Sequence, residues 1–451
     1  MPRDSFRQDR IAIVGTGISG LSAAWLLAPD TDITVYEEAD RTGGHSNTVS
    51  LDFNGREVSV DTGFIVYNEV TYPNLTALFD HLKVATHATN MSFAASLRGG
   101  DSEYSGESIP GLFAQKTNLV RGRFWAMLYD LQRFYRHAPG DARAPLYRGQ
   151  TLGEYLLVKK YSDAFVNDHL LPLSAAIWSA APGDMLDYPL EAFVQFHDNH
   201  GLLNFVGRPV WRTVRGGSRV YVDKLTKRFA DRIRTCSGVV SINRRADGVE
   251  IVDRTGRVEL FDHVVIASHA DQALAMLGDP SPEERRLLSA FRYSRNEAYL
   301  HSDTALMPRR KKVWASWNFI ESEPGEDRLV VSYWMNKLQD VGACADLFVT
   351  LNPVQLPRED LCHRVETYEH PVIDRAAIDA QKQLWSLQGV NRTWFCGAWF
   401  GAGFHEDGLQ SGLAVAEQLG GVRRPWTVAN ESGRIHSQPA VATKQVASVL
   451  A

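Results

Sequence analysis

The chain has 451 residues, of which 44% are hydrophobic, and it carries a formal net charge of -5 at pH 7. This length and apolar content suffice for a large buried core and for two or three domains, and they exclude a disordered chain. The acidic balance argues against general nucleic-acid binding, because no basic excess is available to release counterions from phosphates. A local basic patch can still contact lipid.

The N-terminal segment joins an apolar strand, a glycine turn and a helix in the sequence IAIVGTGISG, residues 11–20, and the next apolar stretch ends on an acid. Gly15 permits the tight turn, Gly17 lets a pyrophosphate approach the backbone, and Gly20 lets helix and strand pack closely. The helix N-terminus offers N–H groups to phosphates, and the acid accepts hydrogen bonds from a ribose. A chance glycine turn does not explain this order of elements. The predicted dinucleotide contacts are Gly15, Gly17, Ile18, Ser19, Gly20, Glu37 and Glu38.

A second glycine signature, DRTGGH at residues 40–45, follows the ribose acid. It resembles the signature of the superfamily of flavin-dependent amine oxidases, protoporphyrinogen oxidases and phytoene desaturases, whose members carry D-R-x-G-G here and hold FAD. The resemblance implies non-covalent FAD with contacts from Arg41, Gly43, Gly44 and His45. The superfamily usually has Arg where this chain has His45, so a charge role toward phosphate does not carry over. A polar surface turn is the alternative, and it leaves the glycine pair unexplained.

The middle of the chain contains predicted helices followed by predicted strands. Apolar alternation predicts strands within residues 58–64, 238–242, 248–252, 262–267, 313–320 and 329–335. Helical periodicity predicts helices over residues 73–82 and 119–137 and within residues 151–180. By the superfamily resemblance, the D-x-G segment near residue 61 passes close to the flavin and the strand near residue 239 meets the adenine. The contacts that this implies are Thr62, Gly63, Phe64, Val239, Val240 and Ser268.

A strand, a glycine-rich loop and a helix follow at residues 391–416. This segment resembles the closing motif of the superfamily, in which a loop crosses the flavin and a helix begins at the isoalloxazine C2 carbonyl. Partial positive charge at that helix N-terminus stabilises an anionic reduced flavin by about 1 kcal/mol. The FAD contacts implied here are Gly397, Gly408, Leu409, Gln410 and Ser411.

The motifs together imply an α/β chain with a Rossmann-like FAD-binding domain of the GR2 type and an inserted α+β substrate-binding domain. We expect residues 1–88, 206–272 and 386–426 to form the FAD-binding domain. Residues 89–205 are predicted to be mainly helical and to face substrate or lipid, and residues 273–385 to supply the sheet of the substrate domain. Residues 427–451 are rich in small and polar side chains, which predicts an extended tail.

Ionisable groups in the closing loop are candidate catalytic residues. His405 is a candidate base or flavin-tuning residue, because histidine titrates near working pH, and its alternative role is to orient the loop by hydrogen bonding. Glu406 is a second catalytic candidate and alternatively a helix-capping acid, with Asp407 as an N-cap. Phe404 stands where amine oxidases often place a tyrosine of their aromatic cage. No metal site is predicted.

Aromatic residues are frequent in the middle of the chain, which favours an apolar substrate, although each can be ordinary core. The predicted lining residues are Phe404, Tyr333, Trp334 and Trp317. The predicted helix at 119–137 carries arginines around an apolar stripe, with Trp125 and Tyr129 at its margin. That pattern fits either a lipid headgroup interface or a buried helix with solvated arginines.

The segments GGHSNTV (43–49), VDTGFIVYN (60–68) and GFHEDGLQSG (403–412) resemble one bacterial group of predicted NAD/FAD-binding proteins. The group is often associated with cyclopropane-fatty-acid-synthase-like methyltransferases, and some relatives act on membrane fatty acyl chains in making methylated furan fatty acids. The resemblance implies an FAD-dependent acyl-lipid dehydrogenase or desaturase, with a phospholipid acyl chain as substrate and a methyltransferase as partner. The alternatives are an amine oxidase releasing hydrogen peroxide, a fatty acyl double-bond isomerase, and a non-catalytic lipid-holding flavoprotein.

The four cysteines, at positions 236, 344, 362 and 396, form no CxxC pair. This usage is typical of reduced, buried thiols in a cytoplasmic protein. Residues 11–28 are apolar enough to imitate a membrane span or signal peptide, but their glycines and the following acidic strand end favour the nucleotide fold. We therefore expect a cytoplasmic protein and leave peripheral contact with the inner membrane open.

Overall fold

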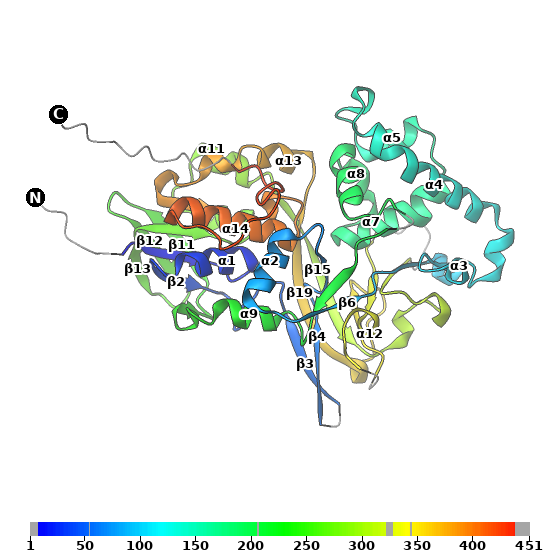
Figure 1. Ribbon diagram of the computed structural model, residues 1–451, viewed down its shortest axis with the longest axis horizontal. Coiled ribbons are helices and arrows are strands. Elements are labelled where there is room, and N and C mark those ends of the chain that lie inside the picture. Colours follow the sequence, from blue (N-terminus) through cyan, green and yellow to red (C-terminus); the bar gives the residue numbers. More distant parts are fainter. Residues whose placement is uncertain (1–7, 54, 205–206, 322–327, 343–344, 438–451) are drawn as a thin grey trace, which may run out of the picture. The chain divides into compact units, whose positions relative to one another are not determined.

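The computed structural model describes residues 8–53, 55–204, 207–321, 328–342 and 345–437. The chain divides into two compact units. The first comprises residues 1–42, 226–289 and 380–451, and the second comprises residues 43–225 and 290–379. Each unit is therefore assembled from segments that are far apart in the sequence (Figure 1). The assignment of individual segments to FAD binding or to substrate binding stays a prediction.

The first unit is built on a parallel sheet in the strand order β10-β2-β1-β14-β20. All four pairs of neighbours run parallel. β1 and β14 are buried along almost their whole length, which explains their apolar sequences, because strands inside a parallel sheet are covered on both faces. The strands are β1 (Arg10–Val14), β2 (Asp32–Tyr36), β10 (Ile233–Arg234), β14 (His263–Ile266) and β20 (Thr393–Phe395).

The helices of the first unit include one that is apolar on all sides. All ten residues of α1 are buried, which accounts for the run that imitates a membrane span. No helix among the described residues combines the length and the apolarity that a bilayer crossing requires. The helices are α1 (Ile18–Leu27), α10 (Ala270–Met276), α11 (Pro282–Leu288) and α14 (His405–Gly420). A separate antiparallel sheet contains β11 (Val239–Arg244), β12 (Val249–Asp253) and β13 (Val258–Phe261).

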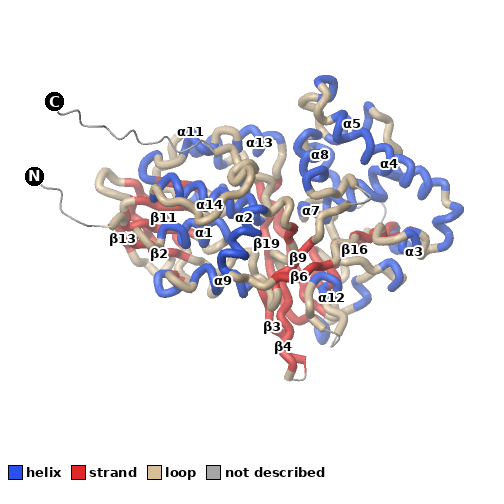
Figure 2. Tube along the Cα trace, in the orientation of Figure 1, coloured by secondary structure: helices blue, strands red, loops and turns tan. Residues whose placement is uncertain are grey.

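The second unit contains a mixed seven-stranded sheet in the order β19-β15-β18-β17-β16-β7-β8. Its strands are β7 (Phe93–Leu97), β8 (Ser102–Ser105), β15 (Arg292–His301), β16 (Trp317–Ile320), β17 (Val331–Trp334), β18 (Phe348–Leu351) and β19 (Cys362–Val372). Figure 2 shows β3 and β4 side by side as a two-stranded ribbon. The smaller strands are β3 (Thr48–Phe53), β4 (Arg56–Asp61), β5 (Tyr67–Asn68), β6 (Thr86–Thr89) and β9 (Trp211–Val214).

Helices of the second unit gather in the segment between β8 and β9 (Figure 1). They are α3 (Ile109–Leu112), α4 (Gly122–Asp141), α5 (Leu152–Val158), α6 (Asp163–Phe165), α7 (Leu171–Trp178) and α8 (Leu190–Asn199). α2 (Pro73–Leu82) confirms the predicted helix there, and α12 (Met335–Leu338) follows β17. The chain passes between the units within α9 (Arg219–Thr226) and α13 (Arg375–Gln381).

Several predicted elements have different bounds in the structure, as β4 at residues 56–61 and β11 at residues 239–244 show, and two of the differences have the same cause. The helix predicted at 119–137 begins only at Gly122, because a 3-10 turn over Lys116–Val120 precedes it. The strand predicted at 313–320 is confined to β16, since Lys311–Val313 form a 3-10 turn. In both cases an apolar residue of a turn extends the periodic pattern without extending the element.

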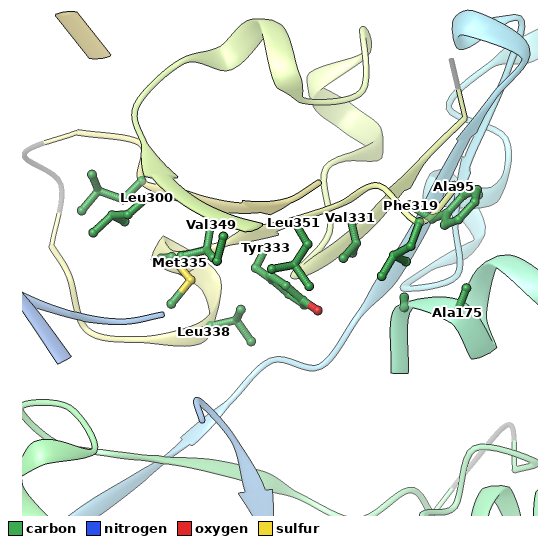
Figure 3. Close-up of a cluster of buried hydrophobic side chains, with 14 of the residues drawn as sticks. Ala95, Ala175, Leu300, Phe319, Val331, Tyr333, Met335, Leu338, Val349 and Leu351 are labelled. Atoms are coloured by element: carbon green, nitrogen blue, oxygen red, sulfur yellow. The ribbon is translucent and has the colours of Figure 1, made fainter. Parts of the chain in front are cut away.

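The main hydrophobic cluster of the second unit lies on the seven-stranded sheet. Figure 3 shows Val331 and Tyr333 of β17 among aliphatic and aromatic side chains of the neighbouring strands and of α12. Residues two apart on a strand share one face, which is why alternate residues of β17 belong to this cluster. Ala175 of α7 also belongs to it, so a helix packs against the sheet here.

The cysteine prediction is correct only in part. The described cysteines are free thiols, of which Cys396 is buried, Cys362 is partly exposed and Cys236 is exposed. Burial of Cys236 was the wrong expectation, because the residue occupies a turn at φ +52° after β10. Cys344 lies outside the described residues.

Buried histidines predict a loss of stability in mild acid. Removal of water lowers the pKa of the His197 imidazole to about 4, whereas an unfolded histidine has a pKa of about 6.5. Between these two pKa values the unfolded chain binds a proton at this histidine and the folded chain does not. The contribution of His197 to stability is therefore complete above about pH 6.5 and is lost as the pH falls below that value. We expect His197 to account for about 2 kcal/mol of the unfolding free energy lost between about pH 7.5 and 5.

Urea unfolding of wild type and His197→Gln at both pH values measures this difference. The variant should show the smaller pH dependence, whatever its own stability. His137→Gln, at an exposed histidine, is the matched control and should behave as wild type. An unchanged pH dependence in His197→Gln would contradict the prediction.

Candidate active site

The glycine turn after β1 forms a cradle of the shape that a pyrophosphate requires. Gly15 has φ +103°, and an added Cβ there would lie 3.0 Å from the backbone oxygen of Ala267. A Cβ on Gly20 would overlap the backbone oxygen of Gly15, so α1 can start this close to the turn only with glycine. At Gly17, by contrast, no described atom would lie within 4 Å of an added Cβ. Backbone atoms thus pack closely against Gly15 and Gly20, whereas the space beside Gly17 is open. This arrangement fits a dinucleotide phosphate at a helix N-terminus.

Glu37 is oriented toward this cradle by three hydrogen bonds. The Thr16 N–H donates to Glu37 Oε2 at 3.0 Å, and the Thr16 hydroxyl also donates to this oxygen. The Ala39 N–H donates to Oε1 at 2.8 Å. An ionised carboxylate has about four acceptor positions, so it can still accept bonds from ribose hydroxyls. The structure therefore places the predicted ribose acid beside the predicted phosphate turn.

The carboxyl ends of the parallel strands bring further predicted contacts to the same edge. Gly15 and Glu37 directly follow β1 and β2, Ser268 comes two residues after β14, and Gly397 comes two residues after β20. The Gly397 N–H donates to Ser411 Oγ at 3.0 Å, which joins β20 to α14. Ligands of open parallel sheets bind outside the carboxyl ends of the strands. Gly408, Leu409 and Gln410 belong to the buried face of α14.

The predicted adenine segment lies beside the ribose acid. The Ser237 N–H donates to the backbone oxygen of Glu37 at 2.7 Å. A register shift between Val239 and Ser241 leaves Val240 outside the paired residues of β11 and β12. The Val240 side chain is 53% exposed, as expected for an open backbone position. Glu38, the other predicted acid, forms an ion pair with Arg254, and Arg41 lies in the turn that follows.

The second glycine signature and the D-x-G segment belong to the second unit, where the structure joins them. The Phe64 N–H donates to the backbone oxygen of His45 at 2.7 Å, and the Thr62 N–H donates to that of Asn47 at 3.0 Å. A Cβ on Gly63 would overlap the backbone oxygen of His45. The glycines at 43 and 44 both have positive φ, +112° and +56°, which explains the glycine pair. The two motifs, at residues 43–47 and 61–64, thus lie side by side, and we call them the loop pair.

Asp61 is the buried carboxylate that holds this loop pair in place. It accepts hydrogen bonds from Thr48 Oγ1 at 2.5 Å, Gln339 Nε2 at 2.6 Å and the Ser218 N–H at 2.9 Å. Burial raises the pKa of the Asp61 carboxyl, and the hydrogen bonds from Thr48, Ser218 and Gln339 oppose that rise. Gly217 has φ +88°, and a Cβ there would overlap Thr48, so the glycine pair at 216–217 is needed for this packing.

Two side chains of β19 lie next to His45 and escaped the sequence analysis. The His45 ring is 5.1 Å from the Tyr368 ring and 5.2 Å from the His370 ring, measured between centroids. The Tyr368 hydroxyl hydrogen-bonds with Thr62 Oγ1 at 2.6 Å and accepts from Asn47 Nδ2 at 3.0 Å. The spacing of two along a strand is the signal that could have paired Tyr368 with His370, but no local motif connects them to His45.

The start of α14 differs from the prediction. The helix begins at His405 with Phe404 as N-cap, so the assignment of Asp407 as N-cap is wrong. Asp407 is the third helical residue, and its Oδ2 accepts the Phe404 N–H at 2.8 Å. Arg434 Nε donates to Asp407 Oδ1 at 2.7 Å, and the carboxylate is fully buried.

That ion pair also corrects the prediction of an extended tail. Residues 429–436 form turns, and Ile435 is 6% exposed, so the chain up to residue 437 packs against the first unit. An arginine that pairs with a buried carboxylate cannot be recognised from a stretch of small and polar residues. Residues 438–451 lie outside the described residues.

The two predicted catalytic residues occupy different environments. Glu406 is fully buried, and its Oε1 accepts a hydrogen bond from Gln410 Nε2 at 2.9 Å. Desolvation lowers the pKa of the His405 imidazole to about 3. Packing around the ring therefore disfavours the imidazolium, which runs against a titration near working pH, while the His405 side chain stays partly exposed. The ring is neutral at pH 7.

The predicted substrate-lining residues do not all lie together. Trp317 and Tyr333 are paired across β16 and β17, with ring centroids 5.3 Å apart. Trp334 points to the opposite face of β17, where its ring lies 5.4 Å from the Trp314 ring. Phe404 belongs to the first unit. Trp317 and Tyr333 are thus the two predicted lining residues that lie on one sheet face, where Tyr333 is part of the buried hydrophobic cluster and Trp317 packs against it.

Comparisons with known proteins agree with this fold. A family model described as flavin containing amine oxidoreductase matches residues 18–315. No curated protein matches the chain. Among solved structures, a putative protoporphyrinogen oxidase from Exiguobacterium sp. 255-15 has a TM-score of 0.65 at 16% identity, covering 92% of this chain and 99% of that chain.

Two further solved structures are similar. The CLA-producing fatty acid isomerase from P. acnes has a TM-score of 0.63 at 15% identity and covers 93% of this chain and 99% of its own. Cyclohexylamine oxidase from Brevibacterium oxydans IH-35A has a TM-score of 0.62 at 15% identity, with coverages of 92% and 100%. These identities show the fold alone, and they confirm the predicted Rossmann-like domain with an inserted substrate domain. The family match over residues 18–315 shows that the chain belongs to the flavin-containing amine oxidoreductases.

Proposed function

We propose that the chain is an FAD-dependent dehydrogenase that desaturates a membrane fatty acyl chain. The cradle formed by Gly15, Gly17 and Gly20 has the shape for a dinucleotide, which favours FAD among the flavins. Non-covalent binding is proposed because Cys396, beside the closing loop, is fully buried and burial raises the pKa of its thiol to about 12. Such a thiol is protonated and a poor nucleophile.

The sheet face shared by Trp317 and Tyr333 is the observation that carries the choice of an apolar substrate. The side chains beside Tyr333 in Figure 3 are aliphatic or aromatic. An ammonium group next to this apolar sheet face would lose its hydration without gaining a carboxylate partner. An acyl chain loses only unfavourable contact with water. Phe404, which lacks the phenol typical of amine-oxidase cages, points the same way.

The shared fold and the sequence motifs supply the acyl class of substrate. The similar P. acnes protein is a fatty acid isomerase, so this fold is compatible with acyl substrates. The motifs at 43–49, 60–68 and 403–412 support membership of the bacterial group associated with fatty-acid methyltransferases, and we propose such a methyltransferase as partner. The phospholipid form of the substrate belongs to the same proposal.

Desaturation removes a hydride from one carbon and a proton from its neighbour. When bound, FAD supplies the hydride acceptor at flavin N5. His405 is proposed to accept the proton, since its imidazole is neutral at pH 7. The N-terminus of α14 contributes partial positive charge, and Glu406, bonded to Gln410, holds the first turn of that helix.

Gly17→Ala tests the cofactor site. No described atom opposes the added methyl group, so the chain should fold as wild type, while the methyl group occupies the space proposed for the pyrophosphate. We expect flavin affinity to fall by about tenfold or more, read from the flavin absorbance of purified protein and by titration of apoprotein with FAD. Gly140→Ala is the matched control, because its Cβ also meets open space and lies in α4. Equal affinity in Gly17→Ala and wild type would contradict the assignment.

Anaerobic mixing with candidate substrates tests the reaction. The flavin absorbance should bleach when the holoenzyme meets a monounsaturated phospholipid, with one diene formed for each flavin reduced, because oxidation of the lipid must equal reduction of the flavin. Product formation without bleaching would replace desaturation by double-bond isomerisation. Bleaching by an amine, with hydrogen peroxide released in air, would replace desaturation by amine oxidation. If no lipid changes the flavin absorbance and none is converted, the protein would be a non-catalytic lipid carrier.

His405→Gln tests the proton acceptor separately from FAD binding. Flavin content should stay unchanged and the bleaching rate should fall by about 100-fold, the lower range for a lost general base. Because the pKa of His405 is about 3, the wild-type rate should show no protonation step from this residue between about pH 5.5 and 8. An unchanged bleaching rate in the variant would remove His405 from the chemistry.

A further inference from the structure

Large apolar side chains are exposed where α4 begins. The exposed fraction is 85% for Val120, 74% for Ile109, 68% for Tyr129, 51% for Leu119 and 49% for Trp125. They come from α3, from the 3-10 turn over Lys116–Val120 and from the first two turns of α4. We call these five residues the apolar tip. Figure 1 shows α3 and α4 in the helical part of the second unit.

Contacts link Trp125 to Leu119 and, through Phe113, to the helical turn that carries Ile109. Trp125 Nε1 donates to the backbone oxygen of Leu119 at 2.9 Å. The Trp125 ring lies 5.8 Å from the Phe113 ring, and the Phe113 N–H donates to the backbone oxygen of Ile109 at 3.2 Å. Tyr129 follows Trp125 by four residues, so both lie on one face of the helix. Isolated exposed hydrophobic residues need no explanation, but a contiguous patch marks an interaction surface.

Basic residues are frequent in the segment that carries the apolar tip. Residues 109–136 contain five lysines and arginines against the single acid Asp130, although the whole chain has a net charge of -5. Asp130 pairs with Arg133 at 2.8 Å, and Arg123 pairs with Asp168 at 2.8 Å. Among the described residues, Lys116, Arg121 and Arg136 are therefore the basic side chains of this segment without a carboxylate partner. Lys116 and Arg136 are exposed, and within the described part of the chain neither forms an ion pair with a carboxylate.

We propose that the apolar tip docks on the surface of an anionic lipid bilayer. Tryptophan and tyrosine are favoured where apolar and aqueous phases meet, and exposed aliphatic side chains such as Val120 enter the acyl boundary. Each lysine or arginine near an anionic surface adds electrostatic attraction. A protein interface is less suited, because the buried core of such interfaces is depleted of charged residues, and Lys116 lies in the same short turn as Leu119 and Val120.

The bilayer as source of the substrate rests on the proposed function, whereas docking can be measured without turnover. Flavin-loaded, full-length protein is floated with vesicles of phosphatidylcholine and phosphatidylglycerol, and with vesicles of phosphatidylcholine alone. We expect binding to the anionic vesicles, weakened by added salt because the attraction of exposed charges is screened. Absence of binding to anionic vesicles would overturn the proposal.

Paired variants assign the binding to the apolar tip. V120S with W125S should lower the partition coefficient by about tenfold or more, since two large apolar side chains no longer leave water. V354S with L356S is the matched control, because these residues are also exposed, at 49% and 61%, and lie outside the tip. Lys116→Gln with Arg136→Gln should remove the preference for anionic vesicles. Flavin content verifies the fold of each variant.

The remaining outcomes separate this proposal from its alternatives. If the V120S and W125S pair binds vesicles as wild type but changes the mass measured by light scattering, the tip is a protein interface and the proposal falls. If the pair loses vesicle binding yet still bleaches with detergent-dispersed lipid, docking and chemistry are separate and both stand. If wild type binds vesicles but no lipid bleaches its flavin, the proposed function falls and the docking surface stands.

Discussion

The close approach of α1 to the turn after β1 is the constraint on which the site of the first unit depends. Gly20 allows it by lacking a Cβ that would overlap the oxygen of Gly15, and Gly412 does the same where α14 passes Ser19. Because both helices pack without intervening side chains, their N-terminal turns and the carboxyl ends of the parallel strands lie at one edge. The phosphate cradle, the ribose acid Glu37 and the closing loop follow from that packing.

In the second unit, hydrogen bonds to a buried carboxylate hold distant segments together, a role that close packing at glycines has in the first unit. Asp61 is 1% exposed and accepts hydrogen bonds from three segments that are distant in sequence. Removing a partner from a buried carboxylate is expensive, since the charge loses hydration and gains nothing in return. This requirement holds the D-x-G segment against the second glycine signature. The buried apolar sheet face around Tyr333 belongs to the same unit.

Local motifs explain which features were predictable. The cradle, its ribose acid, the glycine pair at 43 and 44 and the closing helix were predicted because each needs glycine or an acid at fixed spacing within a short segment. The family and the fold followed from these motifs and are confirmed. Element bounds were less predictable, as at Gly122, because turn residues continue an apolar pattern. The pKa of His405 was not predictable either, since desolvation depends on everything packed around the ring.

The sequence by itself determined a flavin fold of the amine oxidoreductase family, because backbone conformations that only glycine tolerates leave a readable pattern. Tertiary structure alone decided the rest. It brought Tyr368 and His370 beside His45, paired Arg434 with Asp407, and brought Ser218 and Gln339 to Asp61. Each of these contacts joins residues that are far apart in the chain, and such contacts depend on packing that no local spacing encodes.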